Sequence, residues 1–262
     1  MKRFFTNKIV LYFLGICLLI GIWFLVSSLV DVESMVFPNP FKTIKRMVEL
    51  LGQKSTYRYI GFSTLRLIVG FLISFIVAFL LGILVRDNEK LYSLFTPIMT
   101  FFKAAPTATF VFLFIILIGA KNAPVYVVIS VTMPILYESI VSALKSSDKS
   151  VIEASQLDGA SKIQTLFNIQ IPLGIPFIAL GIVSTFAMAF KIEIMAEIIT
   201  GFTNGGIGSI IHTSQIINVT DLTDMFAYSL MAIILVLLLT IVTSLLKQKW
   251  VSKPSKHHVN KV

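Results

Sequence analysis

The amino-acid sequence predicts an all-α membrane protein whose chain crosses the bilayer as six transmembrane helices. Of its 262 residues, 56% are hydrophobic and only 13% are charged, whereas soluble domains are about 45–50% apolar and about 25% charged. Six apolar segments are long enough to cross about 30 Å of hydrocarbon as helices. Lysine and arginine gather at the chain ends and in short polar segments. This pattern is typical of a membrane protein and not of a nucleic-acid-binding one, despite the net charge of +9.

The N-terminal part, residues 1–60, combines a membrane span with a surface segment. Residues 9–30 carry no charge, and this run is longer than the roughly 7–15 residues of a signal-peptide core. We therefore expect an uncleaved first span. Pro38 and Pro40 interrupt any helix that follows. Residues 41–52 then place apolar side chains at helical spacing, which predicts an amphipathic helix on the membrane surface or packed on the bundle.

Three apolar runs follow, and short polar turns separate them. They predict the second span at residues 61–85, the third at 91–120 and the fourth at 123–144. The third run is predicted as a single span, although it contains Pro97 and Pro106.

A hydrophilic segment, residues 145–172, interrupts the apolar sequence. Ser150 and Ser161 are each followed three residues later by Glu or Gln, which is the spacing of a capping box at the start of a helix. Asp158-Gly159 lies between them and predicts a turn, because glycine accepts the positive φ that ends a helix. The segment therefore predicts helix, sharp turn and helix. An ordinary helical connection between two spans is the alternative.

The last third of the chain contains two more spans. Pro172 and Pro176 lie near the start of the fifth, at residues 173–199, and the sixth lies at 225–246. Residues 200–223 between them are predicted as a loop rich in Gly, Asn and Thr. The chain thus divides into an N-terminal part, a core transmembrane domain and a basic tail: residues 1–60, 61–247 and 248–262.

The distribution of basic residues predicts the orientation of the spans. Six spans place both termini on one side, and thirteen lysines and arginines lie on that side against six on the other. The positive-inside rule therefore places both termini and segment 145–172 in the cytoplasm. The expected location is the cell membrane.

One motif connects the hydrophilic segment to a known family. Glu153-Ala154-Ser155 is followed by Gly159 and by Ile171-Pro172, and this order resembles the EAA loop of ABC importer permeases, with Ser155 in place of an alanine. The resemblance implies that the segment is a coupling helix, which docks into a cleft on a cytoplasmic ATPase subunit. The expected coupling residues are Glu153, Ala154, Ser155, Asp158, Gly159 and Ala160.

Further motifs, spread in order over about 170 residues, resemble the nitrate/sulfonate/taurine branch of that family. They are Phe37-Pro38-Asn39-Pro40, Ser63-Thr64-Leu65-Arg66 with Gly70-Phe71, Pro97, Pro106, Gly119, Pro134, Ala196-Glu197 and Gly205-Gly206-Ile207-Gly208. The branch implies the type I ABC importer fold and a small solute such as nitrate, a sulfonate, taurine or a thiamine precursor. The implied partners are a pair of cytoplasmic ABC ATPase subunits, an extracytoplasmic solute-binding protein and a second permease subunit, expected to be a second copy.

No motif for catalysis or cofactor binding occurs in the chain. The Walker A pattern G-x-x-x-x-G-K-[ST] is absent, so ATP hydrolysis is expected on a separate partner subunit. The glycine-rich stretch 205–208 lacks the lysine of a phosphate loop and is predicted as a flexible or tightly turned external loop. The sequence contains neither a nucleophile motif nor a cluster of metal ligands, so we expect neither an enzyme nor a cofactor.

Charged residues inside the spans are the candidates for a transport pathway, because a charge in hydrocarbon usually faces a cavity or a partner. The six are Arg66, Lys103, Glu138, Lys191, Glu193 and Glu197. Glu193 and Glu197 share one helix face, and Arg66 is expected to pair with one of them. Whether that pair lines the path or locks helices together stays open, and Lys103 and Lys191 are pathway candidates. Glu138 is expected to reach toward the inner surface.

An ion-coupled secondary transporter is the alternative function. Glu138, Glu193 and Glu197 would then serve as proton or sodium sites. Such transporters usually contain an inverted repeat of spans, which this sequence lacks. A membrane-embedded enzyme is disfavoured, because no catalytic cluster occurs.

Overall fold

The computed structural model describes residues 8–29, 37–201, 205–217 and 221–251, and every regular element in these ranges is helical. The elements are α1 (Lys8–Leu29), α2 (Pro40–Leu51), α3 (Lys54–Val85), α4 (Glu89–Ala104), α5 (Thr107–Ile118), α6 (Ala123–Lys145), α7 (Lys149–Leu157), α8 (Lys162–Thr165), the π-helical turn Leu166–Gln170, α9 (Ile171–Thr200), α10 (Ile207–Ile217) and α11 (Thr223–Val251). Five helices are long and apolar enough to cross a membrane, or six spans result if α4 and α5 form one broken span. The predicted fold class is confirmed.

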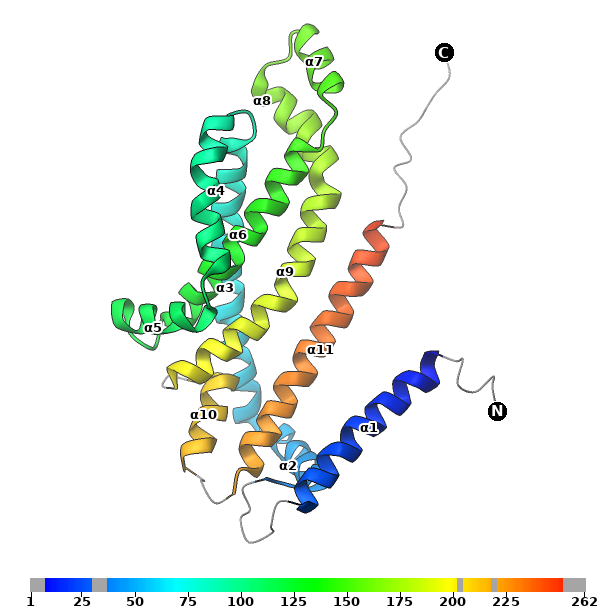
Figure 1. The fold of residues 1–262 in the computed structure, drawn as a ribbon, viewed down its shortest axis with the longest axis vertical. Coiled ribbons are helices and arrows are strands. Elements are labelled where there is room, and N and C mark those ends of the chain that lie inside the picture. Colours follow the sequence, from blue (N-terminus) through cyan, green and yellow to red (C-terminus); the bar gives the residue numbers. More distant parts are fainter. Residues whose placement is uncertain (1–7, 30–36, 202–204, 218–220, 252–262) are drawn as a thin grey trace.

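Helix α6 forms the centre of the bundle and packs mainly against α3 and α9 (Figure 1). Its most apolar stretch is 61% buried, against 33% for α3 and 17% for α11. Helices α7 and α8 project at one end of the bundle, and α2 and α10 lie at the other. We call these the α7 end and the α2 end.

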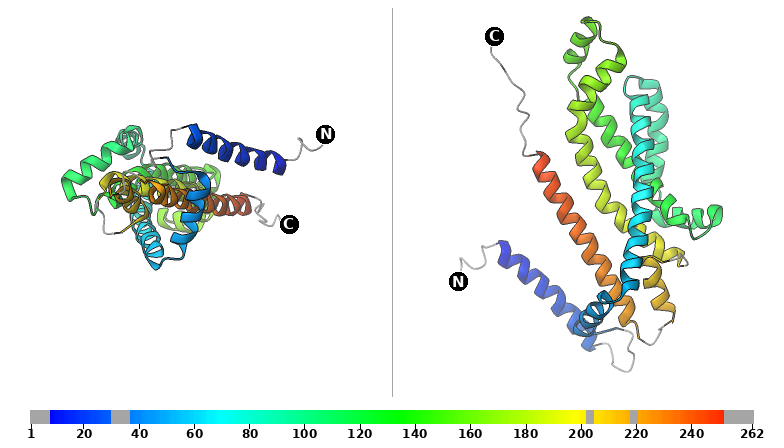
Figure 2. Two further views of the ribbon diagram at one scale, coloured as in Figure 1. Left: turned by 90° about the horizontal axis from the view of Figure 1, so that it is seen from below. Right: turned by 180° about the vertical axis from the view of Figure 1, so that it is seen from behind.

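Helix α1 stands apart from the bundle. Its apolar stretch is 0% buried, and among the described elements its contacts are chiefly with α2. The right-hand view in Figure 2 shows it diverging from α11. An apolar helix with so little intramolecular cover is stabilised by lipid or by another protein.

The prediction of one continuous third span at 91–120 is wrong. Helix α4 ends at Ala104 and α5 begins at Thr107, and the two helices are bent by 98°. Ala105 adopts an extended conformation because it precedes Pro106, which disfavours helical geometry at that residue. Pro97 is instead tolerated inside α4. Helix α5 therefore leaves the bundle sideways (Figure 1).

The fifth span begins earlier than predicted. Helix α8 continues through the π-helical turn into α9, which gives one apolar helix of 39 residues from Lys162 to Thr200. The N–H of Ile171 donates to the Leu166 carbonyl. This wider turn accommodates Pro172, which has no N–H for the helical ladder. Pro172 and Pro176 thus lie inside the long helix and not at its start.

At the α2 end, the helix predicted after Pro40 is confirmed, whereas the loop predicted at residues 200–223 is only partly a loop. Helix α2 begins at Pro40, and the Asn39 side chain caps it by accepting from the N–H of Phe41 at 2.8 Å. The predicted loop at 200–223 is half helix, because α10 occupies Ile207–Ile217 and buries Ile207 and Ile211 against the bundle. The domain boundary at residue 248 falls within α11, and residues 252–262 of the tail lie outside the described residues.

Candidate functional site

Helix α7 is capped by Asp148, and the capping box predicted at Ser150 and Glu153 is therefore wrong. An Asp148 carboxylate oxygen accepts from the N–H of Ser150 at 3.0 Å, so Ser150 lies in the first turn of α7. This backbone hydrogen bond and one from the Ser150 hydroxyl lower the pKa of Asp148. The helix start lies two residues upstream of the predicted cap, because the Asp148 carboxylate accepts from a free N–H of the first turn.

The turn between α7 and α8 forms at Gly159, as the sequence predicted. Gly159 has φ +90°, and the N–H of Ala160 donates to the Ser155 carbonyl at 3.0 Å, which closes α7. The capping box at Ser161 and Gln164 is confirmed. The Ser161 N–H donates to the Gln164 side chain at 2.8 Å, and the Gln164 N–H donates to the Ser161 hydroxyl at 3.2 Å.

The α7–α8 elbow, residues 149–165, exposes apolar side chains as well as polar ones. Leu157 is 88% exposed and Ile163 is 68% exposed, and Glu153 is also exposed. The elbow projects beyond the neighbouring helices (Figure 1). Leu157 and Ile163 therefore leave apolar surface on a projecting segment that the other described elements do not cover.

Arg66 and Glu197 form the ion pair that the sequence predicted. Arg66 Nη1 donates to Glu197 Oε1 at 2.5 Å, and the Glu197 side chain is fully buried. The second carboxylate oxygen accepts from the Ser63 hydroxyl at 2.7 Å and from the N–H of Gly208 at 2.9 Å. One carboxylate thus holds α3, α9 and α10 together.

The glycine-rich stretch 205–208 is tightly turned against this pair. Arg66 also donates to the Gly205 carbonyl at 2.8 Å, and a Cβ built on Gly206 would collide with the Glu197 carboxylate. Gly205 has φ +81° and Gly206 has φ +153°, a region that favours glycine. The stretch is therefore part of the buried junction.

Glu193 is fully buried, and neither of its carboxylate oxygens has a hydrogen-bond partner among the described residues. It lies one helical turn from Glu197 on the same face of α9. Arg66 therefore pairs with Glu197 and not with Glu193.

Lys103 and Glu138 form a second ion pair, which the sequence did not predict. Lys103 Nζ donates to both Glu138 carboxylate oxygens, at 2.8 and 2.6 Å. The side chains are 42% and 49% exposed. Glu138 was expected only to reach toward a membrane surface. The pairing could not be read from the sequence, because it depends on α4 lying beside α6.

Lys191 lies apart from these pairs. It lines a cavity of about 470 Å³ between α9 and α11, whose other lining residues are apolar. No ion pair involves Lys191 in the part of the chain that the structure describes.

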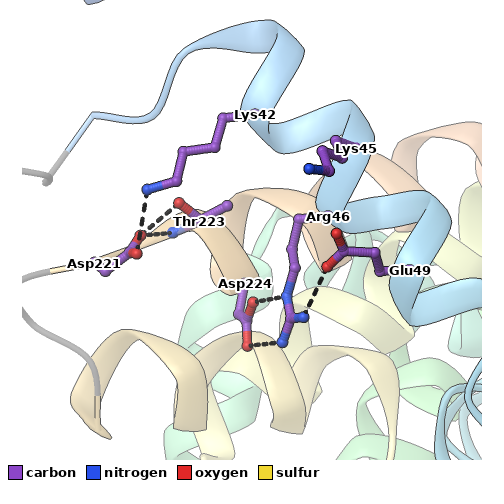
Figure 3. Close-up of a pocket in the computed structure, with 7 residues that line it drawn as sticks. All are labelled: Lys42, Lys45, Arg46, Glu49, Asp221, Thr223 and Asp224. Carbon is purple, nitrogen blue, oxygen red and sulfur yellow. Dashed lines mark hydrogen bonds and ion pairs between the residues drawn. The ribbon is translucent and has the colours of Figure 1, made fainter.

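A cluster of ion pairs at the α2 end joins α2 to the start of α11 (Figure 3). Arg46 Nε donates to Asp224 at 2.6 Å and Nη1 to Glu49 at 3.1 Å, and hydrogen bonds with these two carboxylates raise the pKa of Arg46. Lys42 Nζ lies 3.3 Å from Asp221. The cluster borders a cavity of about 420 Å³. Helix α2 is therefore packed on the bundle, which was one of the two sequence alternatives.

Acid is expected to loosen the contact between α2 and α11. Burial opposes the charged form of Asp221, but hydrogen bonds from Thr223 and Lys42 outweigh it and lower the pKa of this carboxyl. A carboxylate with a lowered folded-state pKa stabilises the fold above its unfolded value of about 3.9, and this contribution is lost as the pH falls through the folded value. The Asp221→Asn variant should lack that acid step.

Trp23 offers the measurement for this acid step. Its ring stacks on Phe226 at 6.3 Å, and its N–H donates to the Pro38 carbonyl at 3.2 Å, close to the cluster. In a Trp250→Phe background, Trp23 emission should shift to the red as the pH falls below about 3.9, where the carboxylate with its lowered pKa protonates. An identical shift in Asp221→Asn would contradict the assignment to Asp221.

The described residues contain no group of three or more His, Cys, Asp or Glu side chains that could hold a metal ion. The charged groups inside the spans are instead paired with each other, buried or exposed singly.

Solved structures share the fold. One of the methionine ABC transporter MetNI in an inward-facing conformation has a TM-score of 0.60 at 18% identity, and the match covers 72% of this chain and 92% of that one. An amino acid ABC transporter with histidines has a TM-score of 0.59 at 15% identity, with 78% and 97% covered. At these identities the likeness concerns the fold alone.

Sequence relatives are permeases. A Brucella melitensis chain named as a probable ABC transporter permease protein is 25% identical over 202 residues, covering 75% of this chain and 78% of that one. The taurine transport system permease protein of Escherichia coli is 20% identical over 213 residues, covering 79% and 76%. The glycine betaine/proline betaine permease of the same species is 29% identical over 132 residues, covering 50% and 36%. Residues 61–253 match the family model of binding-protein-dependent transport system inner membrane components, and the chain therefore belongs to this family of ABC importer permeases.

Proposed function

We propose that the α7–α8 elbow couples this permease to ATP hydrolysis on a separate subunit, with the elbow and both termini in the cytoplasm. The observation that carries the proposal is the geometry of the elbow. It is capped at Asp148 and Ser161, projects from the bundle and continues without a break into the long helix of α9. A capped, partly apolar projection that is continuous with a span can bind a partner and transmit its movement to that span. Glu153, Ala154, Ser155, Asp158, Gly159 and Ala160 are the proposed coupling residues.

The complete importer would contain two permease subunits, two ABC ATPase subunits and an extracytoplasmic solute-binding protein. We propose a second copy of this chain as the other permease, because exposed apolar helices such as α1 need cover beyond the monomer. The solute proposed is a small one of the nitrate, sulfonate, taurine or thiamine-precursor type. The taurine permease relative supports this range, since its match extends over most of both chains.

Reversal of the charge at Glu153 tests the coupling role. Glu153→Lys is expected to lower the amount of ATPase subunit that co-purifies with the permease by about tenfold, which corresponds to about 1.4 kcal/mol of binding free energy. ATP-driven uptake by proteoliposomes should fall with it. The matched control is Lys54→Glu, which reverses an exposed charge at the start of α3, at the α2 end of the bundle. It should leave both the co-purification of the ATPase subunit and the uptake unchanged. Unchanged assembly and uptake in Glu153→Lys would refute the coupling role.

A further inference from the structure

One face of α4 is polar along its length. Ser93, Thr96, Thr100 and Lys103 follow one another at spacings of three and four residues, which places them on one side of the helix, and all four side chains are exposed. A groove of about 560 Å³ runs along Ser93, Thr96 and Thr100 on this side, and Tyr92, Pro97, Phe101 and Ala104 line it as well. The Thr96 and Thr100 hydroxyls donate to carbonyls one turn earlier in α4, at 2.7 and 2.9 Å. We call these four residues the α4 stripe.

The α4 stripe ends in the exposed ion pair between Lys103 and Glu138. Lys103 lies fourteen residues from Glu89, which is about 21 Å along α4, and Glu138 lies about 10 Å from the end of α6 at Lys145. The hydrocarbon layer is about 30 Å thick. With the α7 ends of α4 and α6 at the hydrocarbon boundary, these lengths place the ion pair about 10–21 Å inside the membrane.

An exposed ion pair at this depth does not face lipid. Each charge costs roughly 2.5–3.5 kcal/mol in hydrocarbon on insertion scales. The other ion pair within the spans avoids this cost by burial, because the Arg66 and Glu197 side chains are only 13% and 0% exposed. The Lys103 and Glu138 side chains are 42% and 49% exposed, so this pair requires water or a polar group against it.

We propose that the α4 stripe lines a water-filled solute path and that Lys103 and Glu138 bind a solute carrying charges of both signs. The acidic group of the solute would accept from Lys103, and its ammonium group would donate to Glu138. A zwitterion can replace each partner of the ion pair with a group of the same charge, so neither side chain is left unpaired. This inference rests on the proposed function. Among the proposed solutes it favours the taurine type, which carries charges of both signs, over nitrate.

Thiol labelling tests the water-filled path. In a Cys17→Ser background, Thr100→Cys should react with a membrane-impermeant methanethiosulfonate several-fold faster than Ile98→Cys, because the reaction needs a hydrated thiolate. Ile98 lies at almost the same depth and is 44% exposed, but it points to the opposite side of α4. Equal rates, or faster labelling at residue 98, would overturn the proposal. The assay is run on the assembled importer in proteoliposomes without ATP, so it is independent of the coupling role.

Protection by defined probes tests the charge class. Millimolar taurine should slow the labelling of Thr100→Cys, whereas isethionate, which has a hydroxyl in place of the ammonium group, should protect about tenfold less well, since a charge-assisted hydrogen bond is lost. Adding Glu138→Gln should remove this difference. Glu89→Gln is the matched control, because Glu89 forms another ion pair between α4 and α6 with Lys145, and it should keep the difference. Equal protection by both probes, or none by either, would overturn the zwitterion assignment even if the Glu153→Lys result supports coupling.

Discussion

Arg66→Leu is expected to lower the free energy of unfolding by about 3–5 kcal/mol, because it leaves a buried charge without a partner. The Glu197 carboxylate has no exposed surface and lies between three helices. The hydrogen bonds from Ser63 and Gly208 remain in the variant, but they carry no positive charge to compensate the carboxylate. Unfolding by titration with sodium dodecyl sulfate in mixed micelles measures the change.

Two further variants test whether the loss of stability in Arg66→Leu comes from the unpaired charge on Glu197. Arg66→Leu combined with Glu197→Gln should be more stable than Arg66→Leu alone, because the uncompensated charge at residue 197 is then removed. Lys42→Ala removes an ion pair whose side chains are 49% and 41% exposed, and it should cost less than about 1 kcal/mol. If Arg66→Leu is no more destabilised than Lys42→Ala, the pair with Glu197 does not hold the junction.

Gly208→Ala is expected to cost about 3 kcal/mol or more, at the upper end of what overpacking does. A Cβ built on Gly208 would collide with the Ile194 carbonyl oxygen and lie 2.5 Å from Glu197 Cβ. The first of these atoms belongs to the backbone of α9, so the contact can be relieved only if α10 moves away. That movement would break the hydrogen bond from the Gly208 N–H to Glu197.

Gly61→Ala is the matched control for Gly208→Ala. Gly61 also lies in a helix, α3, but a Cβ there would meet nothing within 4 Å. The substitution should stabilise the protein by about 0.5–1 kcal/mol, because alanine favours helix more than glycine does. The same detergent titration compares the two variants. Equal stability of both would mean that α10 is not seated on α9 as described.

Features with a local cause could be predicted from the sequence. The capping box at Ser161 and Gln164 and the turn at Gly159 depend on residues close together in the chain, and both occur in the structure. The pair between Arg66 and Glu197 is a long-range contact. It was predictable because few charged residues occur in the spans and an unpaired charge there is costly.

Features that depend on how helices pack could not be predicted. The sequence of residues 91–120 does not indicate that Pro106 breaks the span while Pro97 remains within a helix. Each proline removes one helical hydrogen bond, and whether the helix continues depends on how it packs against its neighbours. The pair between Lys103 and Glu138 likewise needs the neighbouring positions of α4 and α6. Helix α10 did carry a signal, since Ile207, Ile210 and Ile211 lie at helical spacing.

Helix α8 continues into α9 without a break, so the fifth span connects the α7–α8 elbow directly to the α2 end of the bundle. Its 39 residues correspond to about 58 Å of helix measured along its path, so a small tilt at one end moves the other end by several ångströms. The far end carries Glu197, which binds Arg66 on α3 and Gly208 on α10. Under the proposed coupling role, a push on the elbow would reach the opposite end of the bundle through this one helix, and α3 and α10 would be carried along with it.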